Sequence, residues 1–213
     1  MEEIRDKFPD SEEKILKYAV DSLKKEFPSQ AYDLVDFLPS DKRLFAKVSV
    51  MSSWIRANPH DCIDKIDSSP ENERLMREAF GIWGRHDPAA AGAYLEEASE
   101  FTSSEAELEL KYSVATEMSL FEPDKLLPWL DRLEDSKISD TLFERASYLN
   151  NLDSDSKITV ASRIKDPESR LKALTRTLKE SVKLRDSEKM VRVIEGLSLS
   201  SMEEKELKDK VLR

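Results

Sequence analysis

Apolar residues recur along this chain with the period of an α-helix. Between residues 11 and 26 they form one stripe of an amphipathic helix, made of Ile15, Leu16, Ala19, Val20 and Leu23. Similar stripes recur in five further segments: Leu44–Trp54, Leu75–Trp83, Leu108–Leu120, Leu142–Leu149 and Leu171–Val182. No run of residues alternates apolar and polar side chains with β-branched enrichment, so we expect an all-α fold without strands.

Four prolines that follow Asn, Asp or Glu predict points at which one helix ends and the next begins. The four segments are Trp54–Pro59, Trp83–Pro88, Met118–Pro123 and Ser162–Pro167. Asn and Asp are preferred N-caps, and proline suits the first helical position because the N–H that it lacks would have no helical partner. Glu122 is a weaker cap. The segment Phe27–Ser29 is predicted to be a variant in which Ser29 is the cap.

Further signals predict where other helices begin. Ser104–Glu107 and Ser201–Glu204 have the spacing of capping boxes, in which a serine and a glutamate satisfy each other's backbone N–H groups. Ser40 follows a proline and is expected to open a helix. Pro128 lies close behind Pro123, which predicts that the helix there starts late or bends.

The prolines also indicate a repeat. Pro28, Pro59, Pro88, Pro123 and Pro167 define a unit of roughly 30–40 residues, the length of a helical-hairpin repeat. The alternative is that any all-α protein starts helices in this way. The repeat interpretation predicts antiparallel hairpins stacked into a short right-handed superhelix, an α-solenoid. We expect a single domain over 1–213, with a repeat core at about 28–182 and capping helices in 183–213.

These Trp-x3-Asx-Pro units resemble the α-solenoids of the tetratricopeptide/HEAT-like class over roughly residues 28–182. No unit carries the full tetratricopeptide set of Trp, Leu-Gly, Tyr, Ala and Pro at a phase of about 34 residues. The chain is more similar to the Trp/Asx-Pro helical hairpins of some bacterial proteins of unassigned function. The resemblance implies that a protein or peptide binds on a curved surface.

Composition narrows the fold classes. The 213 residues include only 4 glycines, where average usage predicts about 15. This scarcity argues against a doubly wound nucleotide-binding fold, a TIM barrel and a β-sandwich, which need glycine in turns and phosphate loops. The net charge of −10 argues against a general nucleic-acid binder, because neutralising phosphates needs a clustered basic surface.

Sequence features also bear on location. No stretch approaches the roughly 18 apolar residues of a membrane span, and the charged N-terminal residues do not resemble a signal peptide. The single cysteine, Cys62, has no partner for an intrachain disulfide, which favours a reducing compartment such as the cytoplasm.

Few residues offer catalytic or metal-binding chemistry. His60 and His86 each lie beside an aspartate, but a metal site needs at least three suitably spaced ligands, so exposed histidines are the favoured interpretation over a metal pair or an acid/base group. Cys62 falls on an apolar stripe and is expected in the core rather than as a nucleophile. Glycine-rich phosphate loops and nucleophile elbows are absent. We therefore predict no enzymatic activity, cofactor or metal.

The three tryptophans, Trp54, Trp83 and Trp129, fall on apolar stripes at helical spacing. We expect them to be core anchors between neighbouring hairpins. The alternative is that one of them lines a binding groove.

Charge is unevenly distributed along the chain. Residues 165–213 hold 13 Lys and Arg against 10 Asp and Glu, whereas the preceding residues hold 21 against 34. The basic residues Lys172, Arg176, Lys179 and Lys183 lie on one helical face and form a candidate docking strip. An ordinary solvated face is the alternative interpretation. An acidic protein or peptide, or the acidic part of a second copy, would complement the strip.

These features predict a non-enzymatic scaffold module that binds a protein or peptide. The alternative is an all-helical enzyme or a HEAT-like domain that acts on nucleic acid. A strongly basic concave groove around buried acids would favour that alternative.

Overall fold

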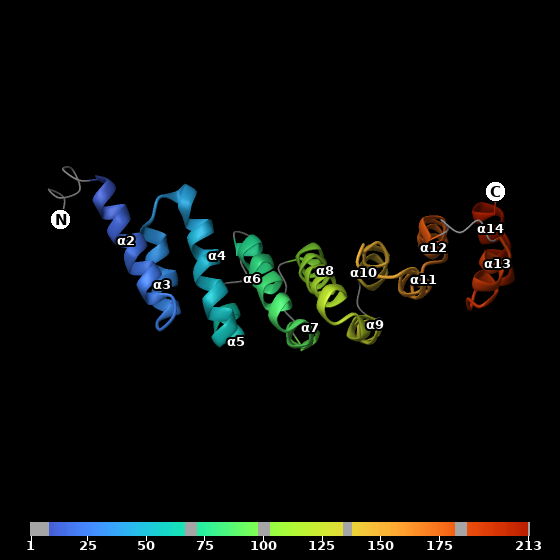
Figure 1. The fold of residues 1–213 in the computed structure, drawn as a ribbon, viewed down its shortest axis with the longest axis horizontal. Helices are drawn as coiled ribbons and strands as arrows, with labels where there is room; N and C mark the ends of the chain where they lie inside the picture. Colours follow the sequence, from blue (N-terminus) through green and yellow to red (C-terminus); the bar gives the residue numbers. More distant parts are fainter. Residues whose placement is uncertain (1–8, 67–71, 98–102, 134–137, 182–186, 213) are drawn as a thin grey trace. The chain divides into compact units, whose positions relative to one another are not determined.

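The described part of the chain is helical almost throughout (Figure 1). The computed structural model describes residues 9–66, 72–97, 103–133, 138–181 and 187–212. Across these ranges the chain forms thirteen α-helices and one short 3-10 helix, with no strand. The all-α prediction is therefore confirmed for these residues. The fold divides into two compact units, the first running to Asp87 and the second beginning at Pro88.

The first unit is built around α4, which packs on α3, α5 and α6. Its apolar core includes the fully buried Val35, Val50 and Met51 together with Phe80. The elements of the unit are α2 (Pro9–Leu23), α3 (Pro28–Leu34), η1 (Val35–Phe37), α4 (Ser40–Ala57), α5 (Pro59–Lys65) and α6 (Glu73–His86).

In the second unit, a helix packs both on the next helix and on the next but one. Thus α8 contacts α9 and α10, and α12 contacts α10, α11 and α14. This pattern brings α14 beside α12, although α13 separates them in sequence. The elements are α7 (Pro88–Glu97), α8 (Ser104–Phe121), α9 (Pro123–Arg132), α10 (Ser139–Ala146), α11 (Ser154–Ser162), α12 (Pro167–Ser181), α13 (Ser187–Glu195) and α14 (Ser201–Val211). The predicted superhelix stays a prediction.

Single residues before proline connect three helix pairs, as the sequence predicted. Asn58, Asp87 and Glu122 each end one helix, and the next helix begins at the following proline. The backbone N–H of each residue donates to the carbonyl four residues earlier, at 2.8 Å in all three cases. The Asn58 side chain also accepts the N–H of Asp61 at 3.2 Å. The Glu122 side chain makes no cap hydrogen bond, which confirms that it is the weaker cap.

Three predicted caps are wrong by one or two residues. Phe27, rather than Ser29, occupies the N-cap position of α3, with Pro28 opening the helix. The caps of α8 and α14 are Ser103 and Ser200, each one residue before the predicted serine. These earlier serines have the extended backbone that an N-cap requires, whereas the following serines are already helical.

Proline does not delay α9. The helix begins at Pro123 and continues through Pro128, so its start is not late. The alternative, a bend at Pro128, stays a prediction. Pro123 at the first position lacks only an N–H that has no partner in a helix of any sequence. The start at Ser40 is confirmed for α4.

All three tryptophans are buried, with exposed fractions of 4 % for Trp54, 2 % for Trp83 and 0 % for Trp129, so the prediction of core positions is confirmed. Among the five apolar residues of the stripe predicted between residues 11 and 26, Ile15 is the one that is exposed, with an exposed fraction of 66 %. Ile15 lies about 140° around the helix from the buried Val20. The buried side of α2 packs on α3 and η1, which leaves Ile15 in solvent.

Candidate functional site

Three of the four predicted strip residues line one shallow groove. Lys172, Arg176 and Lys179 lie on the exposed side of α12 and face a hollow of about 550 Å³. Thr175, Glu180 and Lys210 complete the lining. We call this set of six residues the basic groove. The fourth predicted residue, Lys183, lies outside the described residues.

The apolar side of α12 determines where the cations point. Leu174 and Leu178 are almost completely buried, at 0 % and 1 % exposed, and fix the helix against its neighbours. Thr177 is also buried, and its hydroxyl donates to the carbonyl of Ala173 at 3.0 Å, which satisfies it within the helix. Residues at a spacing of three and four on the other side of the helix therefore face solvent.

Lys210 is the groove cation that sequence reasoning missed. It comes from α14, and it reaches the groove because α12 and α14 pack together. An ion pair with Glu206 at 2.7 Å holds its ammonium group. The helical period of the sequence relates residues within one helix, so it carries no signal for a contact made between two helices.

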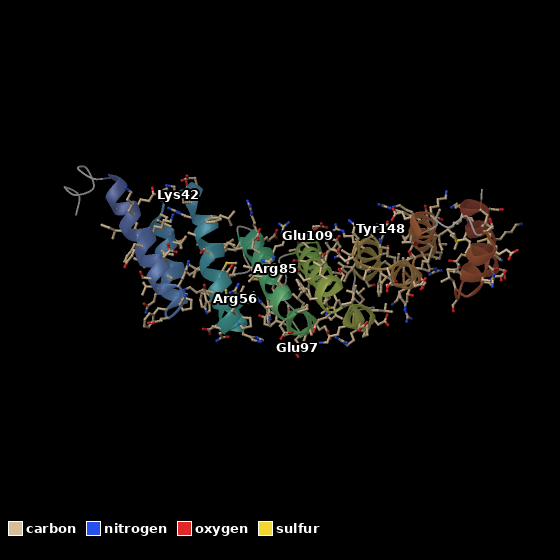
Figure 2. The ribbon with its side chains drawn as sticks, viewed as in Figure 1. Lys42, Arg56, Arg85, Glu97, Glu109 and Tyr148 are labelled. Carbon is tan, nitrogen blue, oxygen red and sulfur yellow. The ribbon has the colours of Figure 1, made fainter. Side chains whose placement is uncertain are left out.

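Arg176 is held from two sides. Its Nε donates to Glu180 at 2.9 Å, and this hydrogen bond raises the pKa of the guanidinium. The guanidinium carbon also lies 4.1 Å from the ring centre of Tyr148, in the range of a cation–π contact. Tyr148 follows the end of α10 (Figure 2). Burial, followed by the nearby charge of Glu144, raises the pKa of the Tyr148 hydroxyl.

The remaining two α12 cations differ in their pairing. Lys172 donates to Glu144 of α10 at 3.1 Å, which raises the pKa of the ammonium group. Lys179 is exposed and makes no ion pair with any residue that the structure describes. The lining of the groove therefore contains four cations and one carboxylate. Lys179 is the cation that has no acidic partner among the described residues.

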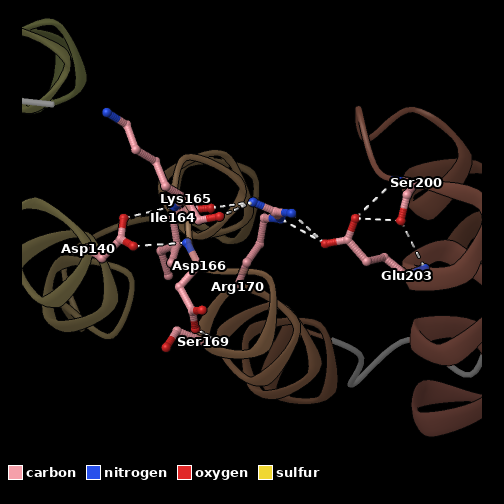
Figure 3. Close-up of polar contacts among 8 residues, drawn as sticks. All are labelled: Asp140, Ile164, Lys165, Asp166, Ser169, Arg170, Ser200 and Glu203. Carbon is pink, nitrogen blue, oxygen red and sulfur yellow. Dashed lines mark hydrogen bonds and ion pairs between the residues drawn. The ribbon is translucent and has the colours of Figure 1, made fainter. Parts of the chain in front are cut away.

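A polar network at the start of α12 connects this helix to α14 (Figure 3). Arg170 donates from Nε to Glu203 Oε1 at 3.1 Å and from Nη1 to the carbonyl of Ile164 at 2.6 Å. Glu203 in turn belongs to the capping box of α14, where it accepts the N–H of Ser200 at 3.0 Å. Hydrogen bonds, first from the Ser200 side chain and then from Arg170, lower the pKa of Glu203.

The same network fixes the turn before α12. Asp140 accepts the backbone N–H groups of Lys165 and Asp166 at 2.8 and 2.9 Å (Figure 3). Asp166 then caps α12 by accepting the N–H of Ser169 at 2.8 Å, which lowers the pKa of its carboxyl group. Charged groups thus join α12 to α10 through Asp140 and to α14 through Arg170 and Glu203. The groove is therefore built on two helices, α12 and α14, that are held together.

A second hollow lies in the first unit, between α2 and α4. Its volume is about 350 Å³, and Val20, Leu38 and Ala46 contribute apolar walls. Phe45 lines it with 82 % of its surface exposed. An ion pair between Lys42 and Glu13 crosses between the two helices (Figure 2 labels Lys42). Sequence reasoning did not identify this hollow.

The histidines and the cysteine do not form a shared site. His60 and His86 are exposed, as predicted. His86 Nε2 accepts a hydrogen bond from Arg56 Nε at 3.0 Å, and His60 contacts the Trp83 ring edge-on at 5.2 Å between centres. Cys62 is fully buried, and burial raises its pKa to about 12, so the prediction of a core cysteine is confirmed.

Within the ranges that the structure describes, His, Cys, Asp and Glu side chains form no group of three or more that could hold a metal ion. None of the helices in those ranges is both long and apolar enough to cross a bilayer.

Comparison with models of known protein families, with curated proteins and with solved structures finds no match to this chain. The resemblance to helical-hairpin repeats therefore stays a prediction.

Proposed function

We propose that this chain is a non-enzymatic protein-binding module that docks an acidic protein surface or peptide in the basic groove. The observation that carries the proposal is the gathering of Lys172, Arg176, Lys179 and Lys210 along one hollow of α12 and α14. The chain as a whole has a net charge of −10, so a cluster of four cations is the opposite of what its overall charge would predict.

Electrostatic attraction favours the binding of an acidic partner at the basic groove. A local cluster of cations raises the on-rate of an oppositely charged partner, and dissolved salt reduces the effect. The lining residues also support binding rather than catalysis. They are three lysines, one arginine, one threonine and one glutamate, a set without the histidine or cysteine that most often activates a nucleophile.

A matched pair of charge reversals tests the proposal. Lys179→Glu places a negative charge in the groove, whereas Lys205→Glu makes the same charge change on α14, about 140° around that helix from Lys210. Both side chains are exposed, so circular dichroism should show the wild-type helical content for both variants. Affinity capture with each immobilised variant, followed by mass spectrometry, identifies proteins that Lys179→Glu loses and Lys205→Glu retains.

Surface plasmon resonance with such a protein then gives the decisive measurement. We expect Lys179→Glu to slow the on-rate by about threefold or more at low salt, with a smaller difference at high salt. An on-rate and a salt dependence equal to those of Lys205→Glu would show that the groove is an ordinary solvated face, and the proposed function would be wrong.

A further inference from the structure

We infer that the occupant of the basic groove is an acidic helix with carboxylates at i, i+4 and i+7, and that Glu180 is the resident carboxylate that this helix replaces on Arg176. The inference rests on the proposed function, because it names the partner chemistry of the same groove.

The spacing of the cations matches a helix better than an extended peptide. Lys172, Arg176 and Lys179 are four and three residues apart on α12, which corresponds to about 6.0 and 4.5 Å along the helix axis. A second helix running parallel to α12 presents side chains at i, i+4 and i+7 with the same rises. An extended peptide presents side chains on one side about every 6.6–6.8 Å, so three successive side chains are too far apart to match the three cations.

The walls of the groove suit a helix as well. The stems of Lys172, Lys179 and Lys210 are aliphatic, so the hollow offers apolar surface below its charged ends. Lys210 on α14 forms a second side, against which the partner helix can pack. Laying an amphipathic helix into a groove between two helices is a common way of recognising a peptide.

The existing ion pairs are of the kind that an incoming acid can replace. The side chains of Arg176 and Glu180 are 58 % and 48 % exposed, and the Lys172 side chain is 74 % exposed. Exposed ion pairs of this kind contribute only about 0–1 kcal/mol each. Exchange of Glu180 for a partner carboxylate on Arg176 is therefore close to neutral, while Lys179 gains a partner.

The same carboxylates disfavour a phosphate backbone. Glu180 lies in the groove, and Glu144 and Glu206 are bound to Lys172 and Lys210. A continuous polyanion places negative charge along all three acids, whereas a helix with three placed carboxylates brings negative charge only to the positions of the three α12 cations. An acidic protein helix is thus the occupant that fits the full set of charges.

Two helical peptides of identical composition provide the probe. Both are built from alanine and glutamine with three glutamates. The aligned peptide carries the glutamates at i, i+4 and i+7, on one face of the helix. The spread peptide carries them at i, i+5 and i+6, on three different faces. Fluorescence anisotropy measures their affinity for the full chain. We expect the aligned peptide to bind about fivefold or more tightly than the spread peptide, and Lys179→Glu to remove the difference.

Glu180→Gln tests the exchange on Arg176. Removing the competing carboxylate should strengthen binding of the aligned peptide about two- to fivefold, the range that an exposed ion pair supplies. Glu97→Gln on α7 is the matched control, because it makes the same charge change at an exposed position outside the groove. Weaker binding by Glu180→Gln, or an equal gain in Glu97→Gln, would overturn the role of Glu180.

The remaining outcomes separate the two proposals. Equal affinity for both peptides, or equally tight binding of a short oligothymidylate, would overturn the helical partner. So would a dimer of the chain, detected by sedimentation, that Lys179→Glu dissociates, because the occupant would then be a second copy. If a captured protein still depends on Lys179 in these cases, the proposed function stands. If neither a peptide nor a captured protein depends on Lys179, both proposals are wrong.

Discussion

Gly92 of α7 lies directly against the indole ring of Trp129 of α9. A Cβ atom placed on Gly92 would be 2.7 Å from Trp129 Nε1 and 2.6 Å from the terminal methyl of Met118. Trp129 is completely buried, and its Nε1 has no hydrogen-bond partner within the described structure. The absent side chain at position 92 is thus what lets α7, α8 and α9 meet around the tryptophan.

Gly92→Ala should lower the free energy of unfolding by about 1–3 kcal/mol, the usual effect of overpacking a core. Met118 can move its flexible end, but the rigid indole ring of Trp129 cannot. Gly196→Ala is the control, because a Cβ there makes only ordinary contacts at 3.4 and 3.5 Å. Urea unfolding followed by circular dichroism checks both variants. Equal midpoints for the two would contradict the close packing at Gly92.

Trp83 is an anchor of the first unit. Its ring stacks on Phe80 with centres 5.8 Å apart and is 2 % exposed. Trp83→Ala should therefore lower the free energy of unfolding by about 3–5 kcal/mol. Phe45→Ala removes an aromatic ring that is 82 % exposed and should change stability by no more than about 0.5 kcal/mol. Chemical denaturation of both variants measures the difference, and a loss below about 1 kcal/mol for Trp83→Ala would show that the ring is not an anchor.

The Cys62 thiol should be unreactive in the folded protein. It is fully buried, and its pKa is raised to about 12, so thiolate is scarce near pH 8. A colourimetric thiol reagent at pH 8 should react fast in concentrated urea and at least about a hundredfold more slowly without urea. Comparable rates in both solutions would mean that α5 opens readily.

Glu203 should make stability depend on acid. Its pKa is lowered in the folded state, first by the hydrogen bond from Ser200. Its stabilising contribution is therefore present above the ordinary carboxyl pKa and is lost as pH falls through the lowered value of the folded state. Glu203→Gln should cost about 1–2 kcal/mol at pH 7 and progressively less in acid. Urea unfolding at a series of pH values tests this, and a difference between the two proteins that stays constant with pH would contradict it.

Asn58 and Glu122 occupy equivalent junctions with different capping. Asn58→Ala removes the hydrogen bond to Asp61 and should lower the free energy of unfolding by about 1 kcal/mol. Glu122→Ala removes no cap bond and should have less than half that effect. Thermal unfolding compares the two variants. A larger loss for Glu122→Ala would show that the junction does not depend on side-chain capping.

Local sequence determined the helices and most of their boundaries. The period of apolar residues predicts the helices and, for most positions, the side that faces inward. Asn58, Asp87 and Glu122 before proline each end one helix and start the next. Both effects act within a few residues, so a single sequence is enough to predict them. Caps were predicted less accurately, because Ser200 and Ser201 are chemically alike and only the backbone conformation distinguishes them.

The tertiary structure determined the contacts between helices and the burial of side chains, which the spacing of residues within one helix does not predict. The sequence placed Lys172, Arg176 and Lys179 on one face, but the packing of α12 on α14 brought Lys210 to them, and the packing of α12 near α10 brought Glu144 and Tyr148. Ile15 was predicted on a buried stripe and is exposed, since burial depends on which neighbour covers each side of a helix. Helical period is a property of one segment, whereas the groove and the core arise from the free energy of packing segments that are distant in sequence.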